Sequence, residues 1–469
     1  MSFINPLFIY FFIVFVIGSL VLRGNIRLWF YVGMSLFFYA YPYPIHVILL
    51  LVASIIDYKV ADVLGKERDA RKRKIILTFS LVSNLAMLGT FKYADFFIHN
   101  INFLSKYFGL SYQIPTLNLV LPIGISFYTF LTLSYTIDVY REKCERAKSF
   151  LEFLTFITFF PHLVAGPIVR AEEFIKQIAD HIPFQKENTI RGIELVLLGF
   201  FKKVIVADHF AQYVEPIFSA PSTYSALGLW LGALFFAIQI YGDFSGYTDI
   251  ARGLARIFGF NFPINFSWPY MSKSIAEFWR RWHMSLSFWF RDYLYIPLGG
   301  NRCGPVRRIF NLVVVWALCG FWHGASANFI FWGLFHGFFV SISQLGDNKV
   351  IKSIPGPVKI IVTFIITLFG WVIFRTKTLE DTFGMWKGML SFSLNDPKLL
   401  FPTITQDSLI FLVLLIIVHI FTYSTQYDFD TKSKLLKTPL WLRAPSVALI
   451  IMLIIFFASK EQPFIYFAF

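Results

Sequence analysis

Nine histidines are the side chains in this sequence best suited to acid–base chemistry, and one of them stands apart. His323 lies in the segment Cys319-Gly-Phe-Trp-His-Gly-Ala, between two apolar runs, where glycines on both sides allow other groups to approach closely. A neutral imidazole can take the proton from a hydroxyl that attacks a thioester, and burial disfavours the imidazolium form. We therefore predict a functional base at His323, in a recess that water reaches. A structural core histidine is the alternative, and a ring sealed in solid packing would contradict the prediction.

A second histidine follows closely in the sequence. His336 lies thirteen residues after His323, in the segment Gly333-Leu-Phe-His-Gly. At about 100° per residue, two side chains this far apart on one helix would face different directions. The spacing therefore gives no reason to pair the two histidines.

Motifs for other chemistries are missing from the sequence. It has no P-loop, no H-E-x-x-H, no G-x-S-x-G and no cysteine pair, and its three cysteines are too few for a disulfide framework or a zinc site. We therefore predict no metal. The glycine-rich segment Gly242 to Asp249 matches no phosphate-binding loop; its spacing favours helix packing, with Asp243 and Asp249 bonded to neighbouring helices. Lys202 and Lys203 fit either cofactor phosphates or anchoring at a membrane surface.

The composition calls for a lipid environment. The chain is 57% hydrophobic and 15% charged, with a mean hydropathy of +0.62, whereas soluble domains have about 25% charged residues. The net charge of +14 comes from short basic clusters between apolar runs. This is the pattern of cytoplasmic loops in a membrane protein. We therefore predict contact with membrane lipid and no binding of nucleic acid.

Apolar runs near the roughly 20 residues that a helix needs to cross a bilayer recur along the chain. They lie near residues 5–22, 27–42, 44–63, 75–92, 116–138, 190–207, 225–241, 310–322, 326–345, 358–375, 408–424 and 444–458. The first run has no basic segment before it and no cleavage site after it, which favours a membrane helix over a signal peptide. Because some runs are short or interrupted, we predict about eleven crossings in an all-α, polytopic membrane protein. Residues 1–469 are expected to form a single domain, with an external loop at 376–407.

The basic clusters predict the orientation. One cluster, at residues 66–74, lies between the third and fourth apolar runs, and another, at 141–148, follows the fifth. Counting crossings places both on one side, which the excess of positive charge makes the cytoplasm. The N-terminus is then expected outside, the basic residues within 432–443 inside, and Phe469 outside.

Two segments depart from simple crossings. Residues 151–170 are apolar but contain Pro161 and Gly166, which interrupt a helix at membrane depth. We predict a re-entrant element there, with a kinked span as the alternative. From Lys273 to Tyr295, tryptophans recur at helical spacing opposite charged residues, which predicts one amphipathic helix in the interface or inside the protein.

A set of long motifs runs in order along nearly the whole chain. They are Leu121–Tyr128, Pro161–Ile168, Gly199–Val204, Tyr241–Asp249, Glu277–His283, Phe290–Gly300, Phe321–Gly324 and Pro463–Phe469. In this set the sequence resembles the membrane-bound O-acyltransferase family, and most closely its bacterial branch for O-acetylation of alginate and other polysaccharides. Leu131 and Ala468 depart from that branch, which often carries glutamine and a polar residue at these places, so the resemblance does not define a particular glycan.

The resemblance implies roles for particular residues. His323, in Trp-His-Gly, looks like the family's catalytic histidine, and His283 looks like its second functional histidine, which lines the tunnel for the acyl donor. The implied fold is a ring of membrane helices around a thin central region. Arg280, Arg281 and Arg291 would then lie near the cytoplasmic mouth and attract an anionic donor such as acetyl-CoA; interfacial anchoring is the alternative.

What the resemblance implies is an O-acetyltransferase in the cytoplasmic (inner) membrane of a bacterium. It would pass acetyl from cytoplasmic acetyl-CoA, with no cofactor kept bound, to an extracytoplasmic polysaccharide such as alginate, peptidoglycan or cellulose. In this branch delivery typically involves a separate extracytoplasmic acetyltransferase of the SGNH type as partner. The alternatives are D-alanyl transfer to teichoic acid from a carrier protein, a transporter for a lipid-linked sugar, and a structural scaffold for a secretion complex.

Overall fold

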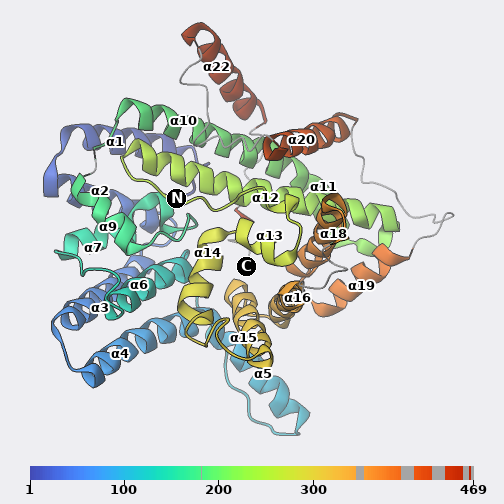
Figure 1. Cartoon of the computed structure of the whole chain (residues 1–469), viewed down its shortest axis with the longest axis horizontal. Coiled ribbons are helices and arrows are strands. Elements are labelled where there is room, and N and C mark those ends of the chain that lie inside the picture. Colours follow the sequence, from blue (N-terminus) through green and yellow to red (C-terminus); the bar gives the residue numbers. More distant parts are fainter. Residues whose placement is uncertain (181, 345–352, 392–405, 425–438, 458–463, 466–469) are drawn as a thin grey trace. The chain divides into compact units, whose positions relative to one another are not determined.

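Helices make up this protein in a computed structural model that describes residues 1–180, 182–344, 353–391, 406–424, 439–457 and 464–465 (Figure 1). Over these residues there is no β-strand, and the all-α prediction is confirmed. The α-helices are α1 Leu7–Val21, α2 Gly24–Ala40, α3 His46–Lys66, α4 Ala70–Leu88, α5 Ala94–Tyr107, α6 Ile125–Tyr140, α7 Phe150–Thr158, α8 Phe160–Leu163, α9 Ala171–Asp180, α10 Lys186–Phe200, α11 Asp208–Ser219, α12 Ala226–Ile257, α13 Ile275–Arg281, α14 Met284–Phe290, α15 Pro305–His323, α16 Ala327–Gln344, α18 Gly356–Arg375, α19 Leu379–Leu390, α20 Gln406–Ser424 and α22 Leu440–Phe457. Shorter π and 3₁₀ segments are η1 Gly89–Tyr93, η2 Phe201–Ala207, η3 Pro221–Thr223, η4 Pro269–Met271 and η5 Arg291–Tyr295.

The chain divides into two compact units. The first contains residues 1–192 and 254–263, and the second contains 193–253 and 264–469. The prediction of one domain over residues 1–469 stays a prediction.

The first unit has an aromatic core and a buried polar network. In the core, the Phe15 ring lies 4.9 Å from that of Phe160 and 4.8 Å from that of Phe258. Between α3, α4 and α6, the buried carboxylate of Asp57 accepts hydrogen bonds from Ser80 Oγ at 2.5 Å and Asn84 Nδ2 at 2.8 Å. Polar side chains bonded in this way join neighbouring membrane helices.

The second unit contains residues 226–253 of the 32-residue helix α12. Gly246 on α12 faces Gly199 on α10 so closely that a Cβ at position 246 would lie 2.7 Å from the Gly199 carbonyl oxygen. The predicted use of the glycine-rich segment in helix packing is therefore confirmed. Further along the chain, α15 packs against α16, α16 against α13 and α18, and α18 against α19.

Membrane-spanning character is visible in the helices themselves. Within the described residues, four helical stretches are long and apolar enough to cross a bilayer: Ala70–Tyr107, Ala226–Ile257, Pro305–His323 and Gly356–Arg375. Shorter apolar helices lie at Leu7–Val21, Ala327–Ser343, Phe411–Ser424 and Ala444–Phe456. These helices indicate a multi-pass membrane protein. Many of the predicted runs form helices shorter than the roughly 20 residues that a crossing needs. The helix lengths therefore do not test the predicted count of about eleven crossings, which stays a prediction.

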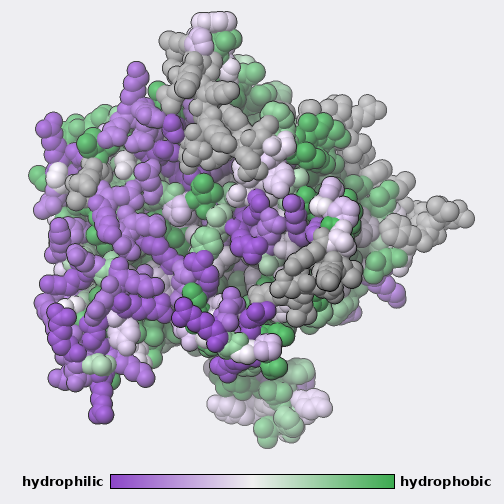
Figure 2. All heavy atoms as spheres, viewed as in Figure 1, coloured by the Kyte–Doolittle hydropathy of each residue, from purple (hydrophilic) through white to green (hydrophobic). Residues whose placement is uncertain are grey.

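The basic cluster between α3 and α4 is solvent-accessible. Figure 2 shows hydrophilic residues gathered over this part of the first unit. The exposed members are Lys66, Arg68, Arg71, Lys72 and Lys74. Which side of the membrane they occupy stays a prediction, and the basic residues at 432–437 lie outside the described residues.

The predicted loop at 376–407 is wrong over its first half. Helix α19, Leu379–Leu390, begins there with a capping box, in which Thr378 and Asp381 bond each other's backbone N–H groups. Met385 and Met389 of α19 are buried. Residues 392–405 lie outside the described residues. Between α7 and α8, by contrast, the helix breaks at Phe159 within the predicted segment 151–170, and residues 153–169 are buried.

Candidate active site

His323 is the last residue of α15, and aromatic rings surround it. Its imidazole lies 4.9 Å from the ring of Trp322, 5.0 Å from that of Trp332 on α16 and 5.5 Å from that of Phe374 on α18. The residue is buried but keeps 5% of its surface exposed. Three aromatic rings therefore enclose this imidazole, one from its own helix and one each from α16 and α18.

Glycines bring the helices of this site together. A Cβ at Gly320 would lie 2.1 Å from the carbonyl oxygen of Phe329, and one at Gly333 would lie 2.1 Å from that of Trp316. Gly324 has the ring of Phe329 against it in the same way. The prediction that glycines around His323 permit close approach is confirmed. The groups that approach are the backbone and side chains of α16.

A polar cluster fixes the position of Phe374 at the end of α18. Asn328, near the start of α16, donates through Nδ2 to the carbonyl oxygens of Ile373 at 2.5 Å and Thr376 at 2.8 Å. Its Oδ1 accepts from the hydroxyl of Thr382 on α19 at 3.1 Å. One buried amide thus ties α16, α18 and α19 together beside His323.

His283 lies at a break between α13 and α14. Its φ of 42° and ψ of 55° lie in the left-handed region, which a continuous right-handed helix cannot include. The prediction of a single amphipathic helix from Lys273 to Tyr295 is therefore wrong. The break is held by Asn265, whose Oδ1 accepts from the backbone N–H of Ser285 at 3.0 Å and from its hydroxyl at 2.9 Å. The Met284 N–H donates to the Asn265 carbonyl oxygen at 3.0 Å.

The surroundings of His283 are more closed than those of His323. The residue is 0% exposed, and its ring lies 4.6 Å from that of Phe244 on α12. Burial lowers the pKa of His283 to about 3. From the end of the chain, Phe464 packs 5.7 Å from Phe244 and stacks on Tyr247 at 4.6 Å. The imidazole of His283 is therefore neutral and is enclosed by apolar rings.

Both predicted histidines lie in the second unit, and a series of edge-on and tilted aromatic contacts connects their surroundings. From His323, contacts run through Phe374 to Trp371, at 5.8 Å between rings, and from Trp371 to Trp282, at 4.8 Å. Trp282 directly precedes His283 in the sequence. A series of aromatic contacts thus links the ring of His323 to the residue next to His283.

The three arginines that were predicted to bind the donor differ in whether a carboxylate lies beside them. Arg281 donates to Glu277 at 2.9 Å and Arg291 donates to Asp292 at 2.7 Å, so each has a carboxylate beside it. Arg280 is exposed and forms no ion pair with any residue that the structure describes. A role in binding an anionic donor stays a prediction for all three, and the charge of Arg280 is the least compensated.

The two lysines of the Gly-Phe-Phe-Lys-Lys segment form ion pairs with carboxylates of the same unit. Lys202 Nζ lies 2.6 Å from Asp249 Oδ2, and Lys203 Nζ lies 2.7 Å from Asp243 Oδ1 and 2.8 Å from Asp208 Oδ1. The suggested uses as a phosphate contact or a surface anchor are therefore wrong for Lys203, which is buried. The prediction that Asp243 and Asp249 bond a neighbouring helical segment is confirmed.

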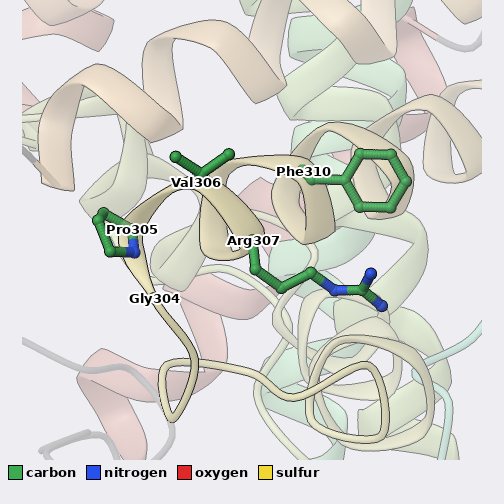
Figure 3. Close-up of a pocket in the computed structure, with 5 residues that line it drawn as sticks. All are labelled: Gly304, Pro305, Val306, Arg307 and Phe310. Atoms are coloured by element: carbon green, nitrogen blue, oxygen red, sulfur yellow. The ribbon is translucent and has the colours of Figure 1, made fainter.

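Neither His283 nor His323 lines either of two surface cavities of the described residues. One, of about 570 Å³, is lined by residues 304–307 and Phe310 (Figure 3). Figure 3 shows these residues on the first turns of α15, where Arg307 extends over the Phe310 ring at 5.3 Å. His323 ends the same helix, about 27 Å away at 1.5 Å per residue. The other cavity, in the first unit, includes His46 and Phe91. The water-filled recess expected at His323 stays a prediction.

One buried residue of the site was missed from the sequence. His336 on α16 accepts a hydrogen bond at Nδ1 from the indole N–H of Trp279 on α13, at 3.2 Å. On one continuous helix His336 and His323 would face different directions, so their spacing does not indicate a shared site. A turn at residues 324–326 instead sends α16 back along α15. Gly333 and Gly337, which face Trp316 of α15, are the signal that would have indicated this packing.

In this helical membrane protein, the histidine of the Trp-His-Gly motif ends a helix that packs closely through glycines, and it lies beside aromatic rings. The pattern of the MBOAT, membrane-bound O-acyltransferase, family matches residues 97–377. This chain is a member of that family, as its motifs predicted, and the family is one of acyltransferases.

Three relatives within or near this family show what the chain is similar to. The probable alginate O-acetylase AlgI of Pseudomonas aeruginosa is 42% identical over 330 residues, which are 70% of this chain and 62% of the relative. The peptidoglycan O-acetyltransferase of Helicobacter pylori is 32% identical over 99% of this chain and 97% of its own. The teichoic acid D-alanyltransferase of Bacillus subtilis is 31% identical over 56% of this chain and 71% of its own. The match thus spans less than two thirds of the Pseudomonas relative.

Proposed function

We propose that this protein transfers an acetyl group from cytoplasmic acetyl-CoA across the membrane, for O-acetylation of an extracytoplasmic polysaccharide. The observation that carries the proposal is the place of His323, the Trp-His-Gly histidine, in an apolar ring of aromatics in a chain that belongs to the membrane-bound O-acyltransferase family. The relatives named as alginate and peptidoglycan O-acetylating enzymes support acetyl as the group and a polysaccharide as the final acceptor.

His323 is the general base in this proposal. Its neutral imidazole takes the proton of the attacking hydroxyl while the hydroxyl oxygen bonds to the thioester carbonyl carbon. The carbon–sulfur bond then breaks, and the imidazolium returns the proton to the departing thiolate as CoA–SH. The surrounding apolar rings keep bulk water from competing with the acceptor hydroxyl.

The other predicted residues act around this step. His283 supports the site as a neutral imidazole in the wall of the donor path. Arg280, with Arg281 and Arg291, attracts the phosphates of acetyl-CoA at the cytoplasmic mouth. Because Arg281 and Arg291 already have carboxylate partners, Arg280 carries most of this attraction.

The location and orientation in this proposal follow the predicted topology. The protein lies in the cytoplasmic (inner) membrane of a bacterium with its N-terminus outside, and no metal or bound cofactor takes part. A separate extracytoplasmic acetyltransferase of the SGNH type receives the acetyl group or passes it to the polysaccharide.

The test is acetyl release from isolated glycan. Cells carrying His323→Ala at wild-type protein level should yield glycan with at least about 100-fold less ester-bound acetyl, because a general base contributes 10²–10⁴-fold. His209→Ala is the matched control: His209 is a half-buried histidine of the same unit, on α11, that packs on Phe411. Acetylation that survives His323→Ala overturns the proposal, and it would favour a transporter or a scaffold.

D-alanyl transfer to teichoic acid is the second candidate, favoured by the similarity to teichoic acid D-alanyltransferases. The purified protein distinguishes the two. With a polysaccharide acceptor present, an acetyltransferase releases CoA–SH from acetyl-CoA without a carrier protein, whereas a D-alanyltransferase is inactive until a D-alanyl carrier protein is supplied. The higher identity to the alginate O-acetylase, 42% against 31%, favours the first outcome.

A further inference from the structure

A buried hydrogen bond joins two rings behind His323. Trp279 on α13 donates its indole N–H to Nδ1 of His336 on α16 at 3.2 Å, and the two rings are nearly perpendicular, at 88°. His336 is 1% exposed. Because Nδ1 accepts, the hydrogen-bond network assigns the proton of this neutral imidazole to Nε2. The bond has a direction, so it fixes the rotation of both rings.

The indole of Trp332 lies between this pair and His323. Its ring is 4.9 Å from His336, 5.5 Å from Trp279 and 5.0 Å from His323, in edge-on contacts of 69°, 81° and 83°. Trp332 is 0% exposed. A rotation of His336 would therefore press on Trp332, and Trp332 forms one wall of the His323 site.

Helix α18 closes the other side of His336. A Cβ at Gly370 would lie 2.7 Å from Nε2 of His336 and 3.0 Å from its Cε1. The imidazole thus has the indole N–H of Trp279 at one nitrogen and the bare backbone of Gly370 near the other. Close packing of this kind leaves no room for a side chain to shift without moving its neighbours.

We propose that His336 and Trp279 are positioning residues, which act through Trp332 to hold the imidazole of His323 in its reactive orientation. The inference rests on the proposed function of His323. Small misplacements of a catalytic group lower the rate far more than they lower binding. An apolar side chain such as leucine at position 336 would occupy the space but would lack the acceptor that orients Trp279.

The test compares two substitutions at position 336 in the purified full-length protein. His336→Leu removes the acceptor, and His336→Gln keeps an oxygen that can accept from Trp279. With acetyl-CoA as donor, a polysaccharide as the hydroxyl acceptor and CoA–SH release as the signal, His336→Leu should lower kcat by about 10- to 100-fold with KM changed less than about 2-fold. His336→Gln should recover most of that loss. A role in packing alone predicts that Gln is no better than Leu, which would overturn the inference.

Trp279→Phe and Trp230→Phe form the matched pair of controls. Each removes one indole hydrogen bond, since Trp230 Nε1 donates to the Met389 carbonyl oxygen at 2.9 Å, but only Trp279 contacts His336. Trp279→Phe should reproduce His336→Leu, and the double variant should be no worse than either, because both remove the same bond. Trp230→Phe should leave kcat unchanged, and an equal loss there contradicts the inference.

A chemical readout separates this inference from the proposed function. Diethyl pyrocarbonate modifies accessible imidazole nitrogens, and mass spectrometry gives the rate at His323 without any acyl transfer. His336→Leu should change that rate at least about 3-fold, as expected for a ring that leaves its packed position, and Trp230→Phe should not. If the wild type releases no CoA–SH but this change occurs, the acetyl-CoA activity fails and the positioning role stands. An unchanged His323 rate in His336→Leu overturns the positioning role.

Discussion

Lys203 and Asp243 form an ion pair buried inside the second unit. The Lys203 Nζ atom lies 2.7 Å from Asp243 Oδ1, and the two side chains are only 5% and 3% exposed. The π-helical segment η2 turns Lys203 toward α12, and Asp208 adds a second carboxylate at 2.8 Å. Buried charges of this kind are compatible with folding only when they are paired, because an unpaired one would lose its hydration without gaining a partner.

Removal of this lysine should destabilise the protein strongly. In Lys203→Met the buried carboxylate of Asp243 and the partly exposed one of Asp208 lose their cation, and the free energy of unfolding should fall by about 3–5 kcal/mol. Thermal unfolding of the detergent-solubilised protein measures the effect. Lys66→Met, which breaks the exposed pair with Asp62, should cost less than about 1 kcal/mol. Adding Asp243→Asn to Lys203→Met should restore part of the loss, and a further loss instead would show that the charge balance is not the cause.

The close contact of α15 and α16 should not tolerate a methyl group. Gly333→Ala would place a Cβ 2.1 Å from the Trp316 carbonyl oxygen, which is backbone and cannot rotate away. The helices must separate, at about 1–3 kcal/mol. Gly384→Ala on α19 is the control, since no atom lies within 4 Å of its added Cβ. That change should stabilise by about 0.5–1 kcal/mol. Melting temperatures of the two variants should therefore shift in opposite directions.

The bend at His283 should depend on the side chain of Asn265. Asn265→Leu removes the acceptor for two groups of Ser285 and should lower the free energy of unfolding by about 1–3 kcal/mol. Asn265→Asp keeps an oxygen in the same place and should lose less if its acid stays ionised. Hydrogen exchange at the Ser285 amide reports the bond directly. Equal protection in Asn265→Leu and wild type would contradict this account of the bend.

Stability should also depend on the protonation of His283. Its pKa is about 3 in the folded protein, against an ordinary value near 6.5. Between these values the unfolded chain binds a proton that the folded chain does not, so stability falls as pH decreases from about 6.5, by at most about 1.4 kcal/mol per pH unit. Asn tolerates a positive φ, so His283→Asn should flatten this part of the melting-temperature profile between pH 4 and 7. An unchanged profile would show that His283 is not the group responsible.

The arginines of the donor site should differ in kinetic effect if acetyl-CoA is the donor. Arg280→Gln should raise KM for acetyl-CoA several-fold at low salt, and less at high salt, because exposed charges are screened. Arg291→Gln should have a smaller effect, since Asp292 already compensates that charge. Initial rates at two ionic strengths measure both. A larger effect at position 291 would reverse the assignment.

The sequence predicted those features that depend on local pattern. The all-α membrane architecture follows from apolar runs, and the tight packing around His323 follows from Gly320 and Gly324. The helix break within residues 151–170 was expected from its two prolines and one glycine, since these residue types interrupt helices.

Features set by distant contacts could not be predicted. The stripe of tryptophans from Trp279 to Trp289 reads as one helix, but Asn265, twenty residues before Ser285, captures the backbone at the break. His336 reaches the surroundings of His323 only because the chain reverses direction after Gly324. Lys203 faces inward because a π-helical segment adds to the helix a rotation that no 3.6-residue pattern contains.

The carboxylate of Asp243 is completed by the far end of the chain. Its Oδ2 accepts the backbone N–H of Ile465 at 2.6 Å, across 222 residues of sequence. Chains fold from the N-terminal side as they are synthesised, so Lys203 and Asp243 can meet long before Ile465 leaves the ribosome. Phe464, which packs on the ring against His283, arrives equally late. A nascent chain therefore cannot assemble the finished surroundings of His283 until translation has passed residue 465.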